Sequence, residues 1–434
     1  MTGTLTVSLV TLGDPGRLTG GYRYHRRMAE LAPACGAAVE FVSFPDRPFP
    51  LPALAGPAVL GRARGDVLVL DSIAAALLSP WRARRQVPVV GSLHQPPGGI
   101  DHGPARRALQ APLDRRAWRR ARLLVVASQA LGDELAAQGF PPQRVRVVPP
   151  GRDLPVPTGR PPLDLRRGRR SSLLCVANWV ERKGILELLE ATARLPDPLA
   201  TLHLAGDDRA DSRYGARVRA RLARADLAGR VVVHGPVPAE QVAVLYRDAD
   251  VFALPSLREP CGTVWGEAMA AGLPVVGWRA GNLPHLATDG REGLLADTGD
   301  VAGLSRALRR LAEDEALRRR LAAAAARRAA ARPTWARSAE LFFAALREAV
   351  GLRRLRRAAG VSAPDRPRAV RSRPWAHRAR TSTVTASASG GRIASRSRSR
   401  MLAAVACSAA RSRSRSQTMP CSSSSPRATT TSKR

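Results

Sequence analysis

Two glutamates eight positions apart, Glu259 and Glu267, are the residues of this chain whose type and spacing best suit chemistry. The apolar run before them, residues 250–254, predicts a buried strand. The segment Thr263–Ala271 favours a helix, which the glycine after it would end. One carboxylate is therefore expected in a loop and the other about one turn into a helix. This loop and helix follow the carboxyl end of the strand, and open α/β sheets bind their ligands at that end.

The backbone between the two glutamates suits an anion such as a phosphate. The N–H groups of Gly262, Thr263 and Val264 fall at the expected helix start, where backbone donors lack partners within the helix. A carboxylate repels a phosphate, so the glutamates are expected to hold neutral hydroxyl groups, which sugars and riboses supply in pairs. Either glutamate alone is more simply explained as a solvated charge. The pair in this strand–loop–helix context favours a binding site.

Three further features could serve the same site, although each also has a simpler structural explanation. Lys183 precedes a glycine at the start of a predicted helix, from which its mobile ammonium group could reach a diphosphate. Gly20 and Gly21 would let the backbone approach a ligand closely, or would simply form a turn. His94 lies just past the end of a predicted strand. A single histidine is more often structural, but this position favours a role in the site.

The stretch from Leu254 to Val276 resembles the E-x7-E signature of the retaining family-4 glycosyltransferases, which have the GT-B fold. The resemblance implies that Glu259 contacts the transferred sugar and that Glu267 binds the ribose of a nucleotide. It also implies that the glycine pair faces the donor diphosphate and that His94 lies near the sugar. The loop that is implied to cover the sugar and the diphosphate comprises Pro260, Cys261, Gly262 and Thr263.

The chain departs from the pattern of that family at two places. The family usually has Gly-Arg where this chain has Ala177-Asn178, and the arginine of that pair joins the lysine on the phosphates. Arg182 is a candidate for the missing cationic contact. A Gly-Gly-x-x-Glu pattern is also altered, because Asn282 and His285 replace its second glycine and its glutamate. The details of that second loop are therefore not transferred to this chain.

Strands and helices alternate along the chain in two blocks, which predicts an α/β fold with two Rossmann-like parallel sheets. The resemblance adds that the two domains face each other across a cleft, as in GT-B enzymes. The first helix is expected from Tyr22 to Leu31, and the last from Ala336 to Val350, crossing back to the amino-terminal domain. The expected strands are residues 5–12, 39–44, 67–71, 87–93, 123–128, 145–148, 173–176, 201–204, 231–233, 251–254, 274–277 and 293–295.

The predicted organisation has five parts. They are an acceptor-side domain (1–151), a linker rich in proline and arginine (152–172), a nucleotide-sugar domain (173–333), the last helix (334–351) and a tail (352–434). The tail holds 20 Lys and Arg against one acidic residue, and its alternating Ser-Arg runs predict disorder. Such runs can bind RNA through phosphate contacts. A frame-shifted or read-through end explains them equally well, so nucleic-acid binding is not expected.

The remaining composition limits the class of protein. The five cysteines form no CxxC pair, which suits a reducing cytosol and argues against a structural zinc site. No apolar run reaches the length of a membrane span, and the first residues predict a strand rather than a signal peptide. A cytoplasmic protein is therefore expected. The basic body leaves open a peripheral contact with the anionic inner membrane face, although an arginine-rich coding bias explains that charge more simply.

Together these residues predict a glycosyltransferase that moves a sugar from a nucleotide-sugar donor to a small-molecule, glycan or lipid-linked acceptor. Lys183, Arg182 and the backbone amides of residues 262–264 would stabilise the leaving diphosphate, so neither a metal ion nor a further cofactor is expected. The resemblance implies retention of anomeric configuration. Two alternatives stay open. One is another GT-B activity, such as a nucleotide-sugar epimerase or a sugar phosphorylase, and the other is a nucleic-acid-binding protein that acts through the basic tail.

Overall fold

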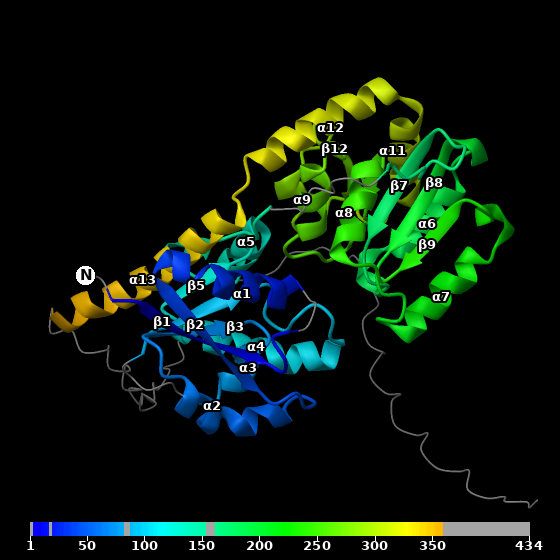
Figure 1. Cartoon of the computed structure of the whole chain (residues 1–434). Coiled ribbons are helices and arrows are strands. Elements are labelled where there is room, and N and C mark those ends of the chain that lie inside the picture. Colours follow the sequence, from blue (N-terminus) through cyan, green and yellow to red (C-terminus); the bar gives the residue numbers. More distant parts are fainter. Residues whose placement is uncertain (1–2, 17–19, 82–86, 153–160, 359–434) are drawn as a thin grey trace, which may run out of the picture. The chain divides into compact units, whose positions relative to one another are not determined.

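The structure is a computed structural model that describes residues 3–16, 20–81, 87–152 and 161–358. Within these ranges, twelve strands form two separate sheets of six strands each (Figure 1). The first sheet has the order β2-β1-β3-β4-β5-β6, and every neighbouring pair in it is parallel. Its strands are β1 (Leu5–Leu12), β2 (Ala37–Phe44), β3 (Val67–Asp71), β4 (Val89–Leu93), β5 (Leu123–Val126) and β6 (Val145–Val147).

The second sheet has the order β12-β11-β10-β7-β8-β9 and is also parallel throughout. All the predicted strands are present in the two sheets, with ends displaced by at most two residues. The predicted α/β fold with two Rossmann-like sheets is therefore confirmed. The strands of the second sheet are β7 (Ser171–Val176), β8 (Ala200–Ala205), β9 (Val231–Gly235), β10 (Val251–Ala253), β11 (Val275–Trp278) and β12 (Gly293–Ala296).

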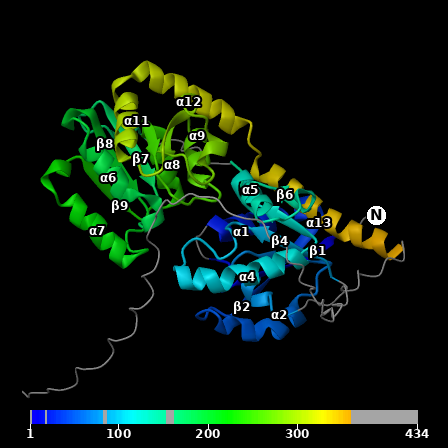
Figure 2. The same ribbon diagram turned by 180° about the vertical axis from the view of Figure 1, so that it is seen from behind.

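Helices connect successive strands within each sheet, as parallel pairing requires. Figure 2 shows that helices lie beside both sheets and that the last helix of the chain returns to the first sheet. None of the helices in the described ranges has the length and apolar character needed to cross a bilayer. The helices of the first half are α1 (Gly20–Leu31), α2 (Gly56–Arg62), α3 (Ala75–Leu78), α4 (Pro104–Arg120) and α5 (Gln129–Ala137). Those that follow are α6 (Ile185–Ala193), α7 (Ser212–Leu222), α8 (Ala239–Asp248), α9 (Thr263–Ala270), α10 (Leu283–Leu286), α11 (Val301–Glu313), α12 (Glu315–Ala330) and α13 (Trp335–Ala358).

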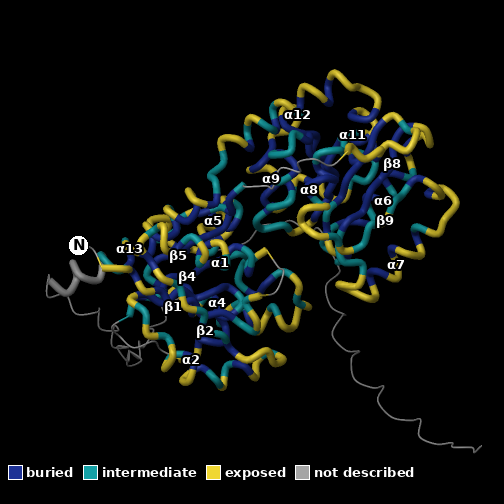
Figure 3. Tube along the Cα trace, viewed as in Figure 1, coloured by how far each residue is buried: buried dark blue, intermediate teal, exposed yellow. Residues whose placement is uncertain are grey.

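The side chains of the first sheet divide between two apolar cores. In β3, Val67 and Val69 belong to one core and Leu68 and Leu70 to the other, because successive side chains of a strand alternate between its faces. Every residue of β3 is buried, which explains the continuous apolar run that predicted it. The second sheet has one extensive core. Figure 3 shows the buried positions concentrated along the strands of both sheets.

The last helix, α13, packs into one core of the first sheet. Phe342, Phe343 and Leu346 are fully buried there. The helix was expected to end at Val350 but continues to Ala358. A glycine inside a helix costs only about 1 kcal/mol relative to alanine, so Gly351 does not stop it, and the leucines and arginines that follow favour helix. Residues 352–358, which were predicted to belong to the tail, are therefore part of the helix. The other residues of the predicted tail, 359–434, lie outside the described ranges.

The start of the first helix also differs from the prediction. Helix α1 begins at Gly20 rather than at Tyr22, so the glycine pair forms its first turn instead of a loop. Glycine is acceptable at this end because the first N–H groups of a helix have no partner within the helix in any case. The preceding residues 17–19 lie outside the described ranges.

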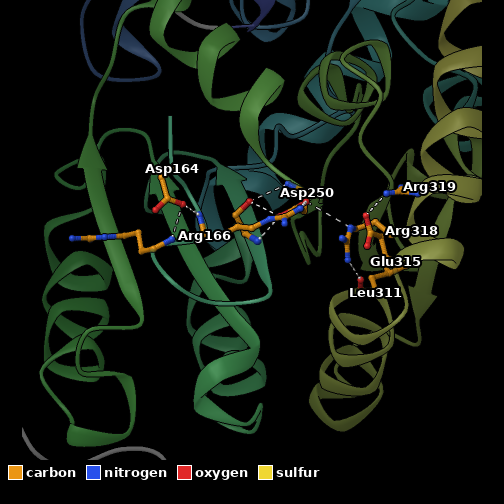
Figure 4. Close-up of polar contacts among 9 residues, drawn as sticks. Asp164, Arg166, Asp250, Leu311, Glu315, Arg318 and Arg319 are labelled. Atoms are coloured by element: carbon orange, nitrogen blue, oxygen red, sulfur yellow. Dashed lines mark hydrogen bonds and ion pairs between the residues drawn. The ribbon is translucent and has the colours of Figure 1, made fainter. Parts of the chain in front are cut away.

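A buried carboxylate attaches the segment before β7 to the second sheet (Figure 4). Arg166 donates two hydrogen bonds to the carboxylate of Asp250, at 2.9 and 2.7 Å. The backbone N–H and the hydroxyl of Ser172 donate to the same carboxylate at 2.8 and 3.0 Å. The Nε atom of Arg318, on α12, lies 3.7 Å from it. Leu165, the residue before Arg166 in the chain, is buried in the core of the second sheet.

These contacts change the predicted linker of residues 152–172. Its last part belongs structurally to the second domain, since Leu165 and Arg166 are anchored there and β7 begins at Ser171 instead of Leu173. The linker was predicted from its many prolines and arginines. Composition alone does not show that Arg166 binds the carboxylate of Asp250, about 80 residues later in the chain. Residues 153–160 of the predicted linker lie outside the described ranges.

Candidate functional site

The loop that follows β10 is fixed in place by the helix start behind it. Gly262 precedes α9 with a φ of 70°, a left-handed conformation that favours glycine. A Cβ atom at this position would lie 2.8 Å from side-chain atoms of both Leu286 and Trp265, so a larger residue would displace the loop. Gly262 offers no side chain to cap α9. A ligand anion can take that place, because the first N–H groups of a helix attract negative charge.

Glu259 lies in this loop with two cations beside its carboxylate. Its Oε2 atom accepts a hydrogen bond from the ammonium group of Lys183 and lies 3.4 Å from Nη1 of Arg182. Burial works to raise the pKa of Glu259, but Lys183, Arg182 and the backbone N–H of Gly262 together hold that pKa below its ordinary value. Glu259 is therefore an ionised carboxylate at neutral pH, although its side chain is only 14 % exposed. The N–H of Gly262, which was expected to serve a phosphate, thus also acts on the carboxylate of Glu259.

Lys183 reaches Glu259 because two loops touch at a glycine. A single 3-10 turn, Glu181–Lys183, follows β7 and ends at Gly184, whose φ is 70°. A Cβ atom on Gly184 would lie 2.2 Å from the carbonyl oxygen of Pro255. Only glycine permits this approach of the two backbones, so the position of the lysine depends on it.

Arg182 ties the same two loops together through its backbone. Its carbonyl oxygen accepts hydrogen bonds from the N–H of Leu257 at 2.8 Å and from the hydroxyl of Ser256 at 3.0 Å. Its guanidinium donates from Nε to a carboxylate oxygen of Asp101 at 2.6 Å. These contacts hold a permanent positive charge beside Glu259.

Glu267 lies in α9 and has different partners. Its Oε1 accepts a hydrogen bond from Nη1 of Arg23 at 3.0 Å, and its Oε2 lies 3.5 Å from the hydroxyl of Tyr246. Burial raises the pKa of Glu267 above its ordinary value, although Arg23, Tyr246 and Arg332 act in the opposite direction. The pKa values of the two carboxyl groups are therefore shifted in opposite directions, because cations dominate around Glu259 and burial dominates around Glu267.

His94 follows β4 and is enclosed by polar and aromatic groups. Its Nε2 atom lies 3.1 Å from Nε2 of His25 and 3.5 Å from the hydroxyl of Ser92. The ring of Tyr24 packs edge-on against it, with ring centroids 4.6 Å apart. Burial, together with the neighbouring His25, lowers the pKa of His94 to about 3. The His94 ring is therefore neutral at physiological pH.

The glycine pair lies beside this histidine. A Cβ atom on Gly21 would be 3.6 Å from the ring of His94, which is an ordinary contact, and one on Gly20 would meet nothing within 4 Å. The surrounding protein would therefore accept an alanine at either position. Both glycines line the same cavity as His94. Their lack of a side chain therefore leaves room in the cavity, and the backbone conformation does not require glycine at either position.

That cavity, of about 370 Å³, brings most of the predicted site residues together. Its volume is near the lower end of pockets that bind small molecules. Lys183 and Gly262 stand outside its lining and contact Glu259, whereas Val264 and Glu267 lie along α9. The predicted residues that line the cavity are Gly20, Gly21, His94, Arg182, Glu259, Pro260, Cys261 and Thr263.

Five residues that shape the site were not identified from the sequence. Arg23 and His25 lie two and four positions after the glycine pair on α1, so their position was a usable signal. Asp71 was another, because it is the charged residue that ends an otherwise apolar strand, where ligands of parallel sheets bind. Tyr246 and Arg332 come from distant segments, and nothing in their local sequence points to the site.

Two family models match the chain. The model described as glycosyl transferases group 1 matches residues 165–328, and the model of Glycosyltransferase Family 4 matches residues 5–155. The first match begins at the anchored segment before β7 and covers the second sheet. The second match covers the first sheet from β1 through β6.

Two curated relatives with the same name match part of the chain. The chain is 33% identical over 231 residues to a D-inositol 3-phosphate glycosyltransferase of Corynebacterium kroppenstedtii, covering 50% of this chain and 51% of that protein. It is 38% identical over 189 residues to a protein of the same name from Xylanimonas cellulosilytica, covering 40% and 44%. The chain thus spans about half the length of the curated relatives it matches.

Solved structures resemble the chain over a longer range. Sucrose-phosphate synthase from Thermosynechococcus elongatus aligns with a TM-score of 0.69 at 22% identity, over 80% of this chain and 100% of that one. The Anabaena protein HepE, crystallised with UDP-glucose, aligns with a TM-score of 0.67 at 20% identity, over 79% and 100%. At this level of identity the likeness shows the fold, which is the predicted GT-B fold.

Proposed function

Because the chain belongs to the family-4, group 1 glycosyltransferases, we propose that it transfers a sugar from a nucleotide-sugar donor to a hydroxyl-bearing acceptor. The observation that carries the proposal is the cluster of Glu259, Lys183 and Arg182 at the start of α9. Cations and N–H donors bind phosphates, whereas an ionised carboxylate accepts strong hydrogen bonds from sugar hydroxyls. The two loops that meet at Gly184 supply both kinds of group side by side.

In this proposal the cations serve the leaving diphosphate. The ammonium of Lys183 has three donor hydrogens, so it can hold Glu259 and a phosphate oxygen at the same time. Arg182 takes the place of the arginine that the family usually has two residues after the first β-strand of this domain, since its guanidinium already lies beside Glu259. The negative charge that develops as the glycosidic bond breaks is stabilised by these groups, and no metal ion or further cofactor takes part. The sugar is transferred with retention of its anomeric configuration.

The proposal assigns the nucleotide ribose to Glu267. A carboxylate has two oxygens and can accept hydrogen bonds from both vicinal hydroxyls of a ribose. Arg23 and Tyr246 hold the same carboxylate from the side and leave lone pairs on its oxygens. Glu259 is assigned to the hydroxyls of the transferred sugar, and His94 to a position near that sugar.

The name shared by the curated relatives suggests the acceptor. We infer a polyhydroxylated small molecule that carries a phosphate, and D-inositol 3-phosphate is the first acceptor to test. The acceptor is assigned to the first domain, and the reaction to the cytoplasm.

A ligand screen followed by kinetics tests the proposal. A nucleoside diphosphate that binds the folded chain raises its stability by about 2.7 kcal/mol at a hundredfold excess over Kd, so a thermal-shift panel should reveal the base. The matching nucleotide sugar should then be consumed in the presence of D-inositol 3-phosphate. Glu259→Gln should abolish this turnover, and Glu181→Gln, which changes an exposed glutamate near Lys183, should not. Consumption of donor without any acceptor would favour an epimerase instead.

A further inference from the structure

Asn282 occupies the position of the second glycine in the Gly-Gly-x-x-Glu pattern and is buried, with 4 % of its surface exposed. It lies just before α10, where an asparagine usually accepts a hydrogen bond from the first N–H groups of the helix. Its side chain makes no such bond to α10. A buried amide that does not cap its own helix needs other partners, and both of its partners lie in segments distant along the chain.

The first partner is the loop that contains Glu259. The Nδ2 atom of Asn282 donates a hydrogen bond to the carbonyl oxygen of Cys261 at 2.8 Å. The backbone N–H of Asn282 donates to the carbonyl oxygen of Glu259 at 2.9 Å. One residue therefore fixes the backbone on both sides of Pro260. The bond to Cys261 needs a side-chain donor, which glycine does not have.

The preceding glycine allows this close approach. The φ of Gly281 is 57°, a left-handed conformation, and a Cβ atom there would lie 2.7 Å from the carbonyl oxygen and 2.9 Å from the nitrogen of Glu259. Only glycine fits between the two backbones. The first glycine of the pattern is thus present for packing, whereas the residue in place of the second adds a hydrogen bond to the same loop.

The second partner is the start of α5, in the first domain. The Oδ1 atom of Asn282 accepts a long hydrogen bond, of 3.5 Å, from the backbone N–H of Ala130. This N–H belongs to the first turn of α5, where the helix itself offers no partner. Ser128, which caps the helix, accepts from the N–H of Leu131 instead. Asn282 therefore provides a second cap for α5.

The two side-chain contacts fix the orientation of the amide. A carbonyl oxygen only accepts and a backbone N–H only donates, so Nδ2 must face Cys261 and Oδ1 must face Ala130. The reverse orientation would oppose two oxygens on one side and two donors on the other. The amide thus joins α5 to the loop that lines the cavity.

We propose that Asn282 is a positioning residue for the Glu259 loop, residues 259–263: it holds the loop in its binding conformation before the donor arrives and fixes it to α5. The contact of Glu259 with a sugar rests on the proposed function, whereas the ordering of the loop does not. A loop that is ordered in advance loses less conformational entropy when the sugar binds. The action on Glu259 is indirect, because Asn282 bonds to the backbone of the loop.

Amide hydrogen exchange on the chain without ligand tests the ordering of the loop. Asn282→Ala removes the amide at an ordinary φ of −86°, so it adds none of the backbone freedom of glycine. We expect the N–H groups of residues 261–263 to exchange at least about tenfold faster than in the wild type, the scale of one lost hydrogen bond. Exchange of Ala130 should also accelerate. An unchanged rate for residues 261–263 would overturn the proposal.

A second variant separates the two contacts. Asn282→Asp keeps an oxygen for the N–H of Ala130 but places its other oxygen against the carbonyl of Cys261. Exchange should therefore accelerate at residues 261–263 and not at Ala130. The control is His285→Gln, in the same segment, where the imidazole lies 3.4 Å from a carboxylate oxygen of the exposed Asp133. Equal acceleration of the Glu259 loop in the control would overturn the assignment to the Asn282 amide.

Kinetics connect the ordered loop to the sugar. In Asn282→Ala, KM for the nucleotide sugar should rise about tenfold while kcat stays within about twofold, because the loop must then be ordered when the sugar binds. The affinity for the free nucleoside diphosphate should change by less than about threefold, since that ligand offers no sugar to Glu259. A fall in kcat at unchanged KM would overturn the positioning role. A chain that turned over no nucleotide sugar would refute the proposed function, while hydrogen exchange still decided whether Asn282 orders the loop.

Discussion

The guanidinium of Arg23 and the carboxylate of Glu267 lie 3.0 Å apart, although 244 positions separate the two residues in the chain. The contact joins the helix that begins with the glycine pair, α1, to the helix of the glutamate motif, α9. Because burial raises the pKa of Glu267 and Arg23 opposes that effect, Arg23 keeps more of this carboxylate ionised. An ionised Glu267 is the better acceptor for ribose hydroxyls.

Arg23→Gln should therefore change how nucleoside diphosphate binding depends on pH. Removal of the cation lets the pKa of Glu267 rise further above its ordinary value of about 4.3. As the pH falls, the variant should lose affinity at a higher pH than the wild type, and the two should converge in alkaline solution. Calorimetric titration at several pH values measures this. Arg27→Gln, which changes an exposed arginine of the same helix, is the control. Parallel pH profiles for Arg23→Gln and wild type would rule out the coupling.

The two glutamates of the motif should have separable roles. Glu267→Ala should weaken binding of the free nucleoside diphosphate about tenfold, because the ribose loses its acceptor. Glu259→Ala should leave that affinity nearly intact, since it releases Lys183 for the diphosphate, while turnover of the nucleotide sugar falls. Isothermal titration and steady-state kinetics on the same preparations provide both values. Equal loss of affinity in the two variants would contradict the assignment.

Lys183→Ala should lower kcat/KM for the nucleotide sugar about tenfold to a hundredfold. Loss of a hydrogen bond to a charged group amounts to about 1.5–3 kcal/mol, and the diphosphate gains negative charge as the glycosidic bond breaks. The variant also removes the main cation that lowers the pKa of Glu259. Arg217→Ala, at an exposed ion pair with Glu181, is the matched control. Activity within about twofold of the wild type would show that Lys183 does not contact the phosphates.

The strands, loops and helix starts that depend on the local sequence pattern could be predicted from the sequence. The buried strand Val67–Asp71 was predicted because parallel strands covered on both faces are continuously apolar. The loop and helix start around Gly262 were predicted because glycine and proline interrupt the apolar pattern there. The end of the last helix was predicted wrongly at Val350, because the leucines and arginines after Gly351 favour helix and α13 continues to Ala358.

Contacts between distant segments could not be predicted in the same way. The sequence indicated Glu259 and Lys183 separately, but their ion pair depends on the meeting of two loops at Gly184. Arg23 lies close to the glycine pair, but its local sequence does not indicate which residue of α9 it contacts. The positions of His25 and Asp71 in the sequence pointed to the site, but the short distance between them depends on the order of the strands, which the sequence pattern does not show.

A final prediction concerns Asp250, which anchors the segment before β7 and is shown in Figure 4. Its side chain is 12 % exposed. Burial would raise the pKa of Asp250, but Arg166, the N–H of Ser172 and Arg318 hold that pKa below its ordinary value. A carboxyl group whose pKa is lower in the folded state than in the unfolded state stabilises the fold when the pH is above its pKa in the unfolded state, about 3.9. This stabilisation is lost as the pH falls through the pKa of the group in the folded state.

Asp250→Asn should therefore reduce the free energy of unfolding at pH 7 by about 2 kcal/mol, since the charged hydrogen bonds to Arg166 and Ser172 are replaced by neutral ones. The difference from the wild type should narrow as the pH is lowered below about 4, because the wild type then loses its own carboxylate. Urea denaturation of both proteins across this range measures the effect. Asp197→Asn, at an exposed carboxylate, should show little change at any pH. A difference that stays constant down to the lowest pH would mean that Asp250 acts through packing rather than through its charge.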